Sequence, residues 1–144
     1  MDKLKIEIQL MPGGLMPTQA DGSPAGLDLY SREEVRVPGR GVMGVPTGVK
    51  MAIPDGWYGK IEDRSGVALS TPLSKKAGVI DPDYRGEVVI ILQNISDYPR
   101  FIDKGTKIAQ VTFHKRPILE VTKVEKFTEN EILRGDKGFG SSEK

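Results

Sequence analysis

Apolar and polar residues alternate along much of the chain, which is the pattern of a strand that buries one face. In the first ten residues, Leu4, Ile6, Ile8 and Leu10 are separated by charged or amide side chains. Similar alternation, or a short apolar run, recurs between turn signals rich in glycine and proline. Beyond residues 4–10, the pattern predicts strands over 25–31, 35–37, 42–45, 49–53, 57–61, 101–102, 108–113 and 118–124.

Helical periodicity is nearly absent. Residues 66–70 are compatible with one helical turn capped by Ser65, and the capping-box spacing of Thr128 and Glu131 predicts another turn over 128–133. Lys75 and Lys76 are interpreted as a solvated bend. With 17 glycines and 10 prolines, the chain is predicted to be all-β, with at most one or two short helical turns.

Two apolar segments joined at Asp81-Pro82 form the most informative stretch. Pro82 presets φ for a tight turn, which predicts a hairpin with the Asp81 carboxylate facing outward at its bend. Gly78 and Gly86 are expected to leave room for a ligand beside the backbone. The mouth of this slot has one ring, Tyr84. By itself the stretch fits a plain hairpin and a binding slot equally well.

Composition limits the possible chemistry. The 144 residues suggest one domain, and the net charge of +1 indicates no attraction to nucleic acid or to an anionic membrane. Without cysteine, the chain has no disulfide, thiol nucleophile or cysteine-based metal site. Its one histidine, His114, excludes a multi-histidine metal site and is the only possible histidine of a Ser-His-Asp triad.

The longest apolar run, residues 88–92, is too short to span a bilayer, and the first ten residues do not resemble a signal peptide. We therefore expect an intracellular protein of the cytoplasm or the nucleus, with no nucleic-acid or membrane partner.

Three other features suggest chemistry, each with a plainer alternative. Arg64 precedes the predicted helical turn and fits an anion site or an ordinary helix start. Gln110 interrupts an apolar strand, so its amide either is satisfied in the core or contacts a ligand. In the Gly-rich tail, Arg134 and backbone amides could wrap phosphates and Phe139 could stack on a base, although the composition alone is that of a disordered tail.

Five segments, taken in order, closely resemble the five motifs of the homotrimeric dUTPase family. The resemblance runs from about Pro17 to Ser142, and the string Ala-Gly-Val-Ile-Asp-x-x-Tyr-x-Gly-Glu is its most specific part. The five segments are residues 25–29, 64–68, 77–87, 108–111 and 134–142.

This resemblance implies a jelly-roll-like distorted β-barrel formed by residues 1–133, followed by a flexible lid over 134–144. It also implies a homotrimer with active sites shared between subunits, and hydrolysis of dUTP to dUMP and pyrophosphate with Mg²⁺. That reaction keeps uracil out of DNA and supplies dUMP for dTMP synthesis.

The resemblance also assigns roles to residues. Asp81 would activate the water that attacks the α-phosphorus, and Tyr84 would pack beneath the deoxyribose and leave no room for a 2′-hydroxyl. Asp28 would support the hydrated metal through water. The substrate-binding residues would be Gly78, Val79 and Ile80 for uracil, Phe139 lying over it, and Arg64, Ser65, Gly66, Gln110, Arg134, Gly140, Ser141 and Ser142 for the phosphate side.

Two departures from the family pattern are visible. The tail reads Ser141-Ser142-Glu143 where the family usually has Ser-Thr-Gly, so Glu143 adds an anion near the triphosphate. Leu27 replaces a common aromatic residue, with little expected effect. The alternatives to a dUTPase are a dCTP deaminase of the same fold, a nucleotide-binding module without activity, and a structural jelly roll.

Overall fold

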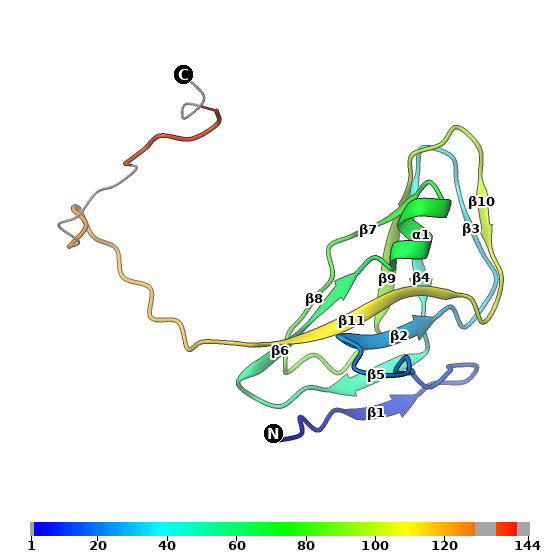
Figure 1. The fold of residues 1–144 in the computed structure, drawn as a ribbon, viewed down its shortest axis with the longest axis horizontal. Helices are drawn as coiled ribbons and strands as arrows, with labels where there is room; N and C mark the ends of the chain where they lie inside the picture. The colour runs from blue at the N-terminus through cyan, green and yellow to red at the C-terminus, as the bar shows by residue number, and fades with distance from the viewer. Residues whose placement is uncertain (1, 129–134, 141–144) are drawn as a thin grey trace.

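The computed structural model describes residues 2–128 and 135–140 (Figure 1). Within these residues the chain forms eleven strands and one short helix. Their bounds are β1 Glu7–Leu10, β2 Gly26–Tyr30, β3 Val35–Val37, β4 Val42–Pro46, β5 Val49–Ala52, β6 Trp57–Glu62, α1 Ser65–Ser70, β7 Leu73–Lys76, β8 Val79–Ile80, β9 Val89–Asn94, β10 Arg100–Ile102 and β11 Lys107–Lys115.

The strands form four antiparallel sheets in the described residues. The largest has the order β2-β11-β6-β8, and a second has the order β4-β9-β7; two-stranded sheets pair β1 with β5 and β10 with β3. The all-β prediction is confirmed, and the arrangement is jelly-roll-like. The predicted barrel is not closed, because each of these sheets ends in strands with only one neighbour.

The core is built largely from every second residue of the strands, which the alternating pattern predicts for residues 49–53 and which β9 shows although residues 88–92 are an uninterrupted apolar run. In β9, Ile90, Leu92 and Asn94 are buried, whereas Val89 and Ile91 are exposed. Each fully buried Leu, Ile or Val contributes about 1.5–3 kcal/mol relative to an exposed one. The buried apolar side chains are Leu29, Val35, Val37, Val45, Val49, Met51, Ile53, Ile61, Leu73, Ile80, Val88, Ile90, Leu92, Ile102, Ile108, Ala109 and Val111.

The predicted hairpin around Asp81 is wrong in its pairing. β8 is hydrogen-bonded to β6, whereas β9 lies between β4 and β7 in another sheet. The tight turn itself is present, because the Tyr84 N–H donates to the Asp81 carbonyl at 3.1 Å. The turn therefore connects two sheets, and Asp81 lies at the end of one of them.

Gly78 and Gly86 make room for the chain's own side chains, and the predicted space for a ligand beside their backbone stays a prediction. Gly78 has φ +112°, and a Cβ there would lie 2.8 Å from the Cβ of Ile61. A Cβ on Gly86 would lie 2.5 Å from the Tyr84 hydroxyl. Both glycines thus allow close packing around the turn.

Three local predictions also need correction. Helix α1 begins at Ser65 itself; its N-cap is Arg64, which makes no side-chain cap because a guanidinium has no acceptor. Lys75 and Lys76 form the end of β7, not a bend. Residues 118–124 form no strand, because no described segment of the chain pairs with their backbone. The helical turn predicted over 128–133 lies almost wholly outside the described residues.

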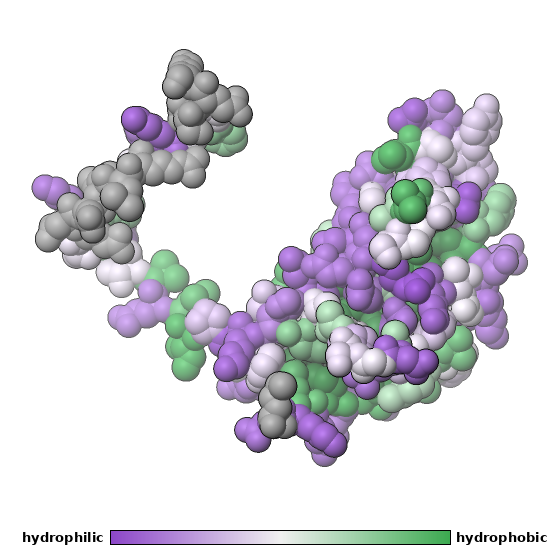
Figure 2. Space-filling view, in the orientation of Figure 1, coloured by the Kyte–Doolittle hydropathy of each residue, from purple (hydrophilic) through white to green (hydrophobic). Residues whose placement is uncertain are grey.

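After β11 the chain leaves the domain as an extended arm, which we define as residues 117–127 (Figure 1). Its apolar side chains contact little: Ile118 is 93% exposed, Val121 91% and Phe127 84%. Figure 2 shows hydrophobic groups, in green, along an arm that extends away from the body. No helix of the described residues has the length and apolar character needed to cross a membrane.

Candidate active site

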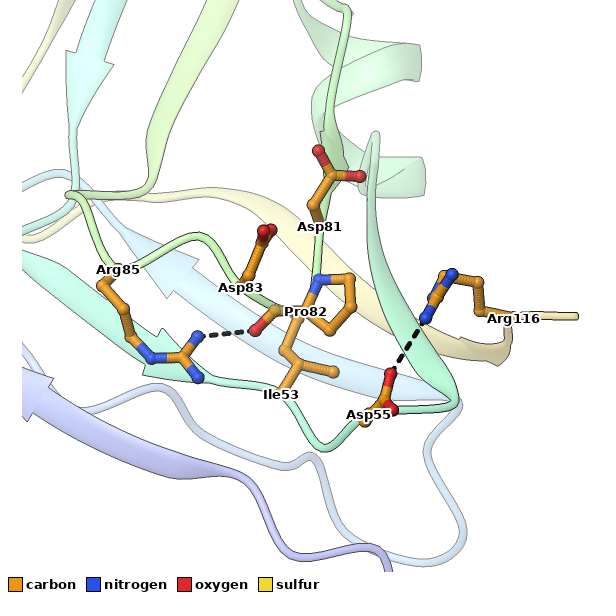
Figure 3. Close-up of a pocket in the computed structure, with 7 residues that line it drawn as sticks. All are labelled: Ile53, Asp55, Asp81, Pro82, Asp83, Arg85 and Arg116. Atoms are coloured by element: carbon orange, nitrogen blue, oxygen red, sulfur yellow. Dashed lines mark hydrogen bonds and ion pairs between the residues drawn. The ribbon is translucent and has the colours of Figure 1, made fainter. Parts of the chain in front are cut away.

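Asp81 lies on the rim of a pocket of about 510 Å³ that is lined by Ile53, Asp55, Asp81, Pro82, Asp83, Arg85 and Arg116 (Figure 3). Its carboxylate is exposed and points away from the Asp55–Arg116 pair. Within the described residues, the Asp81 carboxylate accepts no hydrogen bond and takes part in no ion pair. Asp81 is therefore an uncommitted base at a turn.

Three of the other charged residues of this pocket are engaged, namely Asp55, Arg116 and Arg85, whereas Asp83 is exposed and, like Asp81, has no side-chain partner among the described residues. Nη2 of Arg116 lies 2.9 Å from Oδ1 of Asp55, and this hydrogen bond, helped by the Gly56 N–H, lowers the pKa of Asp55. Arg85 donates through Nη1 to the backbone carbonyls of Pro82 and Tyr84, at 2.5 and 3.1 Å. Arg85 thus stabilises the turn, and the Asp81 carboxylate remains without a partner among the described residues.

Strand β8 presents unpaired backbone groups beside Asp81. It is an edge strand with β6 as its single neighbour in the described structure. The Ile61 N–H donates to the Gly78 carbonyl at 2.8 Å, and Val79 lies opposite Lys60 in the register. In an antiparallel pair alternate residues face the partner, so the N–H and C=O of Val79 face the open edge. The edge offers one donor and one acceptor, and the Val79 side chain is 68% exposed.

Tyr84 is held at the mouth of the turn. Its hydroxyl donates to the Glu87 carbonyl at 2.7 Å, and its ring lies against Gly86. The residue is still 46% exposed. One acid and one ring therefore lie at this turn, as the sequence predicted. The free strand edge beside them was not predicted, because the expected hairpin would have paired it.

A second cluster joins three of the other motifs. Asp28 of β2 and Gln110 of β11 are cross-strand partners. Nε of Arg64 donates to Oδ1 of Asp28 at 3.1 Å, and Nζ of Lys107 lies 3.8 Å from Oδ2. The Gln110 amide donates to the Asp63 carbonyl at 3.2 Å, so this amide is partly satisfied by the protein itself.

The geometry leaves Arg64 able to bind an anion. Only its Nε–H is committed among the described contacts, and its side chain is 32% exposed. Asp28 thus orients the guanidinium while both terminal nitrogens stay available. Ser65 and Gly66 are exposed at the start of α1 beside Arg64.

The two clusters lie at opposite ends of β6. Ile80 pairs with Gly59, which places Asp81 near Tyr58, whereas Arg64 follows the other end of the strand. Tyr58 and Arg64 are six residues apart, which corresponds to roughly 20 Å of extended chain. One chain therefore brings Asp28, Arg64 and Gln110 together, and separately Asp81 and Tyr84, but does not bring the two groups into contact.

The described residues contain no group of three histidine, cysteine, aspartate or glutamate side chains arranged to hold a metal. The carboxylate of Asp28 faces two cations, so its predicted role toward a hydrated metal stays a prediction. In the tail, Phe139 is fully exposed and Gly140 follows it with φ +85°. The predicted site residues Arg134, Ser141 and Ser142 lie outside the described residues.

Sequence reasoning missed Lys107 and Asp63. Lys107 begins β11 beside Asp28, but a lysine at a strand start gives no distinctive pattern. Asp63 links two segments, because its carboxylate accepts the Lys75 N–H at 2.8 Å while its carbonyl accepts Gln110. Its position next to Arg64 was the only signal available.

The family model for dUTPase matches residues 14–143, nearly the whole chain. This chain belongs to the dUTPase family. Among curated members of this family, the deoxyuridine 5′-triphosphate nucleotidohydrolase of Oryza sativa subsp. japonica is 41% identical over 139 residues, covering 96% of this chain and 80% of the relative. The enzyme of the same name from Candida albicans is 38% identical over 141 residues, covering 98% and 88%.

Solved dUTPase structures have the same jelly-roll-like fold. A variant of the Staphylococcus bacteriophage 80alpha dUTPase, solved with dUpNHpp, has a TM-score of 0.88 and 27% identity, covering 96% of this chain and 98% of that one. A variant of the phage phi11 dUTPase, described for its coordination of a structural Mg(II) ion, has a TM-score of 0.77 and 27% identity, covering 85% and 98%. The five motifs, in their order, therefore identified the family correctly.

Proposed function

We propose that this dUTPase-family chain hydrolyses dUTP to dUMP and pyrophosphate, with Asp81 as the base that activates a water for attack on the α-phosphorus. The observation that carries the proposal is the position of Asp81, an uncommitted carboxylate next to a strand edge with free backbone groups. A positioned water and base, together with charge neutralisation, are what cleavage of a phosphoanhydride requires.

The free edge of β8 fits uracil. The N–H and C=O of Val79 offer one donor and one acceptor, which complement a base edge with one carbonyl and one N–H. Cytosine presents an amino group and an unprotonated ring nitrogen there, so buried polar groups would be left unpaired. Gly78 and Ile80 flank this pair, and Tyr84 would lie beneath the sugar.

The Arg64 cluster fits the phosphates. A guanidinium with two free terminal nitrogens binds phosphate oxygens in a bidentate manner, and Ser65 and Gly66 add backbone and hydroxyl donors at the start of α1. Gln110 lies beside them on β11. Arg134, Gly140, Ser141 and Ser142 of the tail would complete this side, with Phe139 over the base.

Mg²⁺ is proposed as the cofactor. This ion binds mainly to substrate phosphates and water, and rarely needs a protein cage. The absence of a three-carboxylate group among the described residues is consistent with that mode. Bound in this way, Mg²⁺ supplies charge neutralisation, and Asp28 is the residue that would meet its water shell.

We also propose a homotrimer whose sites are shared between subunits. The separation of the two clusters along β6 is the arrangement expected when one site takes its base side and its phosphate side from different copies. Two surfaces are available for assembly: the apolar arm, and an outward sheet face formed by Val42, Val89 and Ile91, which are 48%, 43% and 37% exposed.

A nucleotide screen tests the activity. The purified chain is incubated with Mg²⁺ and each of dUTP, dCTP, dTTP and UTP, and release of pyrophosphate and ammonia is measured. We expect pyrophosphate from dUTP alone. Ammonia from dCTP would instead identify a deaminase, and a rise in melting temperature without turnover would identify a binding module. No response to any nucleotide would leave a structural role.

Arg64→Lys should lower kcat/KM for dUTP by about tenfold, because an ammonium cannot hold Asp28 and two phosphate oxygens in one planar fork. Steady-state kinetics measure the effect. Arg40→Lys is the matched control, since Nε of Arg40 pairs with Asp97 at 2.7 Å on an exposed surface. Equal kcat/KM values for the two variants would contradict a phosphate-binding role for Arg64.

Val89→Lys combined with Ile91→Lys should convert the trimer into monomers, because two buried charges at an apolar interface are left without partners. Light scattering coupled to size exclusion measures the mass against the 15.8 kDa of one chain. Leu69→Lys, at a side chain on α1 that is 90% exposed, is the control. An unchanged mass for the double variant would exclude this face from the interface.

A further inference from the structure

Beneath the turn lies an ion pair that the predicted site does not contain. Nε of Arg32 lies 2.8 Å from Oε2 of Glu87, with side chains 24% and 18% exposed. Among the ion pairs of the described residues, it is the only one in which both side chains are less than a quarter exposed. Such a pair is screened by water much less than the exposed ones.

The pair connects four segments of the chain. Oε2 of Glu87 also accepts the Gly48 N–H at 2.8 Å, and Oε1 faces Nη2 of Arg32 at 3.4 Å. Nη1 of Arg32 donates to the Pro12 carbonyl at 3.2 Å. Gly48 has φ +69°, and a Cβ there would lie 2.8 Å from Cδ of Arg32. Both oxygens of the Glu87 carboxylate are therefore held by contacts with Arg32 or with the Gly48 N–H.

This anchoring extends to Tyr84 through one carbonyl group. The Tyr84 hydroxyl donates to the backbone oxygen of Glu87 at 2.7 Å. The next residue, Val88, is also fixed, because its N–H donates to the Val49 carbonyl at 2.8 Å and its carbonyl accepts the Thr47 hydroxyl at 2.6 Å. The acceptor of the Tyr84 hydroxyl thus lies between the anchored Glu87 side chain and an anchored backbone.

We propose that Arg32 and Glu87 are positioning residues for Tyr84, and that they thereby set the discrimination between deoxyribose and ribose. The inference rests on the proposed role of Tyr84 beneath the sugar. A ring excludes a 2′-hydroxyl only while it stays in place, and within the described residues the hydroxyl bond to Glu87 is the one polar contact of the Tyr84 side chain. If the carbonyl moved, the ring would gain freedom and the extra oxygen of UTP would be tolerated.

Two other interpretations of the pair are weaker. A buried ion pair is poor evidence of net stabilisation, because desolvation offsets its attraction. Direct contact with substrate does not explain the pair either, since both Glu87 oxygens are already engaged by the protein. Fixing the geometry of the turn is the role that all of the contacts share.

The test compares kcat/KM for dUTP with kcat/KM for UTP. Glu87→Gln keeps an acceptor for the Gly48 N–H but removes the charge, and we expect the dUTP-to-UTP ratio to fall about tenfold. In a Tyr84→Phe background, which lacks the hydroxyl, the same substitution should change the ratio less than about twofold. Asp97→Asn, which removes the exposed pair with Arg40, is the matched control.

The outcomes separate this inference from the proposed function. An unchanged ratio in Glu87→Gln, or equal effects in the wild-type and Tyr84→Phe backgrounds, would overturn the positioning role. A wild-type enzyme without preference for dUTP, or Tyr84→Ala with unchanged preference, would overturn the role of Tyr84 itself. If Glu87→Gln does not fold, Arg32→Lys replaces it: the planar fork is lost, the charge stays, and the same fall in ratio is expected.

Discussion

Asp81→Asn should lower kcat for dUTP by a factor of about 10²–10⁴, while dUTP still binds. An amide cannot take a proton from water, yet it has nearly the same size as the carboxylate. The turn should also persist, because its internal hydrogen bond uses the backbone carbonyl of Asp81 and not its side chain. Single-turnover measurements and binding of a non-hydrolysable analogue separate the two effects.

Asp83→Asn is the matched control for that experiment. Asp83 is an exposed acid two residues away, and it lines the same pocket as Asp81. If local negative charge alone matters, both variants should lose similar activity. If Asp81 is the base, Asp83→Asn should retain kcat within a few-fold. Near-normal turnover by Asp81→Asn would remove the residue from the catalytic role.

The sequence predicted features that depend on neighbouring residues. Alternation in residues 49–53 predicted the buried side of β5, where Val49 and Met51 face the core, because side chains on a strand point to opposite faces. Asp81 followed by Pro82 gave the tight turn and the exposed carboxylate. These features need no knowledge of which strands pair, so local patterns suffice.

Pairing between distant strands could not be predicted in the same way. Two apolar segments on either side of a turn suggest a hairpin, yet β8 joins β6 and β9 joins β4 and β7. The Arg32–Glu87 pair spans 55 residues, and nothing in the local sequence of either residue indicates the other. Such contacts follow from the topology, which only the structure shows.

The site residues also show this difference between features that local sequence predicts and contacts that depend on the topology. Asp28, Arg64 and Gln110 were found through the family motifs, but their mutual contact required β2, β11 and β6 to be neighbours. The contact refines the predicted role of Asp28: within the described chain it orients Arg64 through Nε and attracts Lys107. Residues 118–124 show the converse case, since their strand-like pattern has no pairing partner among the described residues.

Deleting residues 134–144 should lower kcat/KM for dUTP by about 10²-fold or more, while the melting temperature changes little. In the proposed mechanism the tail supplies Arg134 to the phosphates and Phe139 to the base, and it excludes water once the nucleotide is bound. The fold should survive, because every buried apolar side chain of the described residues lies at or before Val111. Kinetics, thermal unfolding and light scattering measure activity, stability and assembly separately.

Point variants at Phe139 show whether closure over the base explains the effect of the deletion. Stacking on a base contributes about 1–3 kcal/mol, so Phe139→Ala should raise KM about tenfold, whereas Phe139→Tyr keeps an aromatic face and should stay close to wild type. Phe139 is fully exposed in this structure, so a loss of activity in Phe139→Ala cannot come from a lost core contact. An unimpaired truncation would show that the tail is no lid; an impaired truncation with normal Phe139→Ala would assign its effect to the phosphate-binding residues.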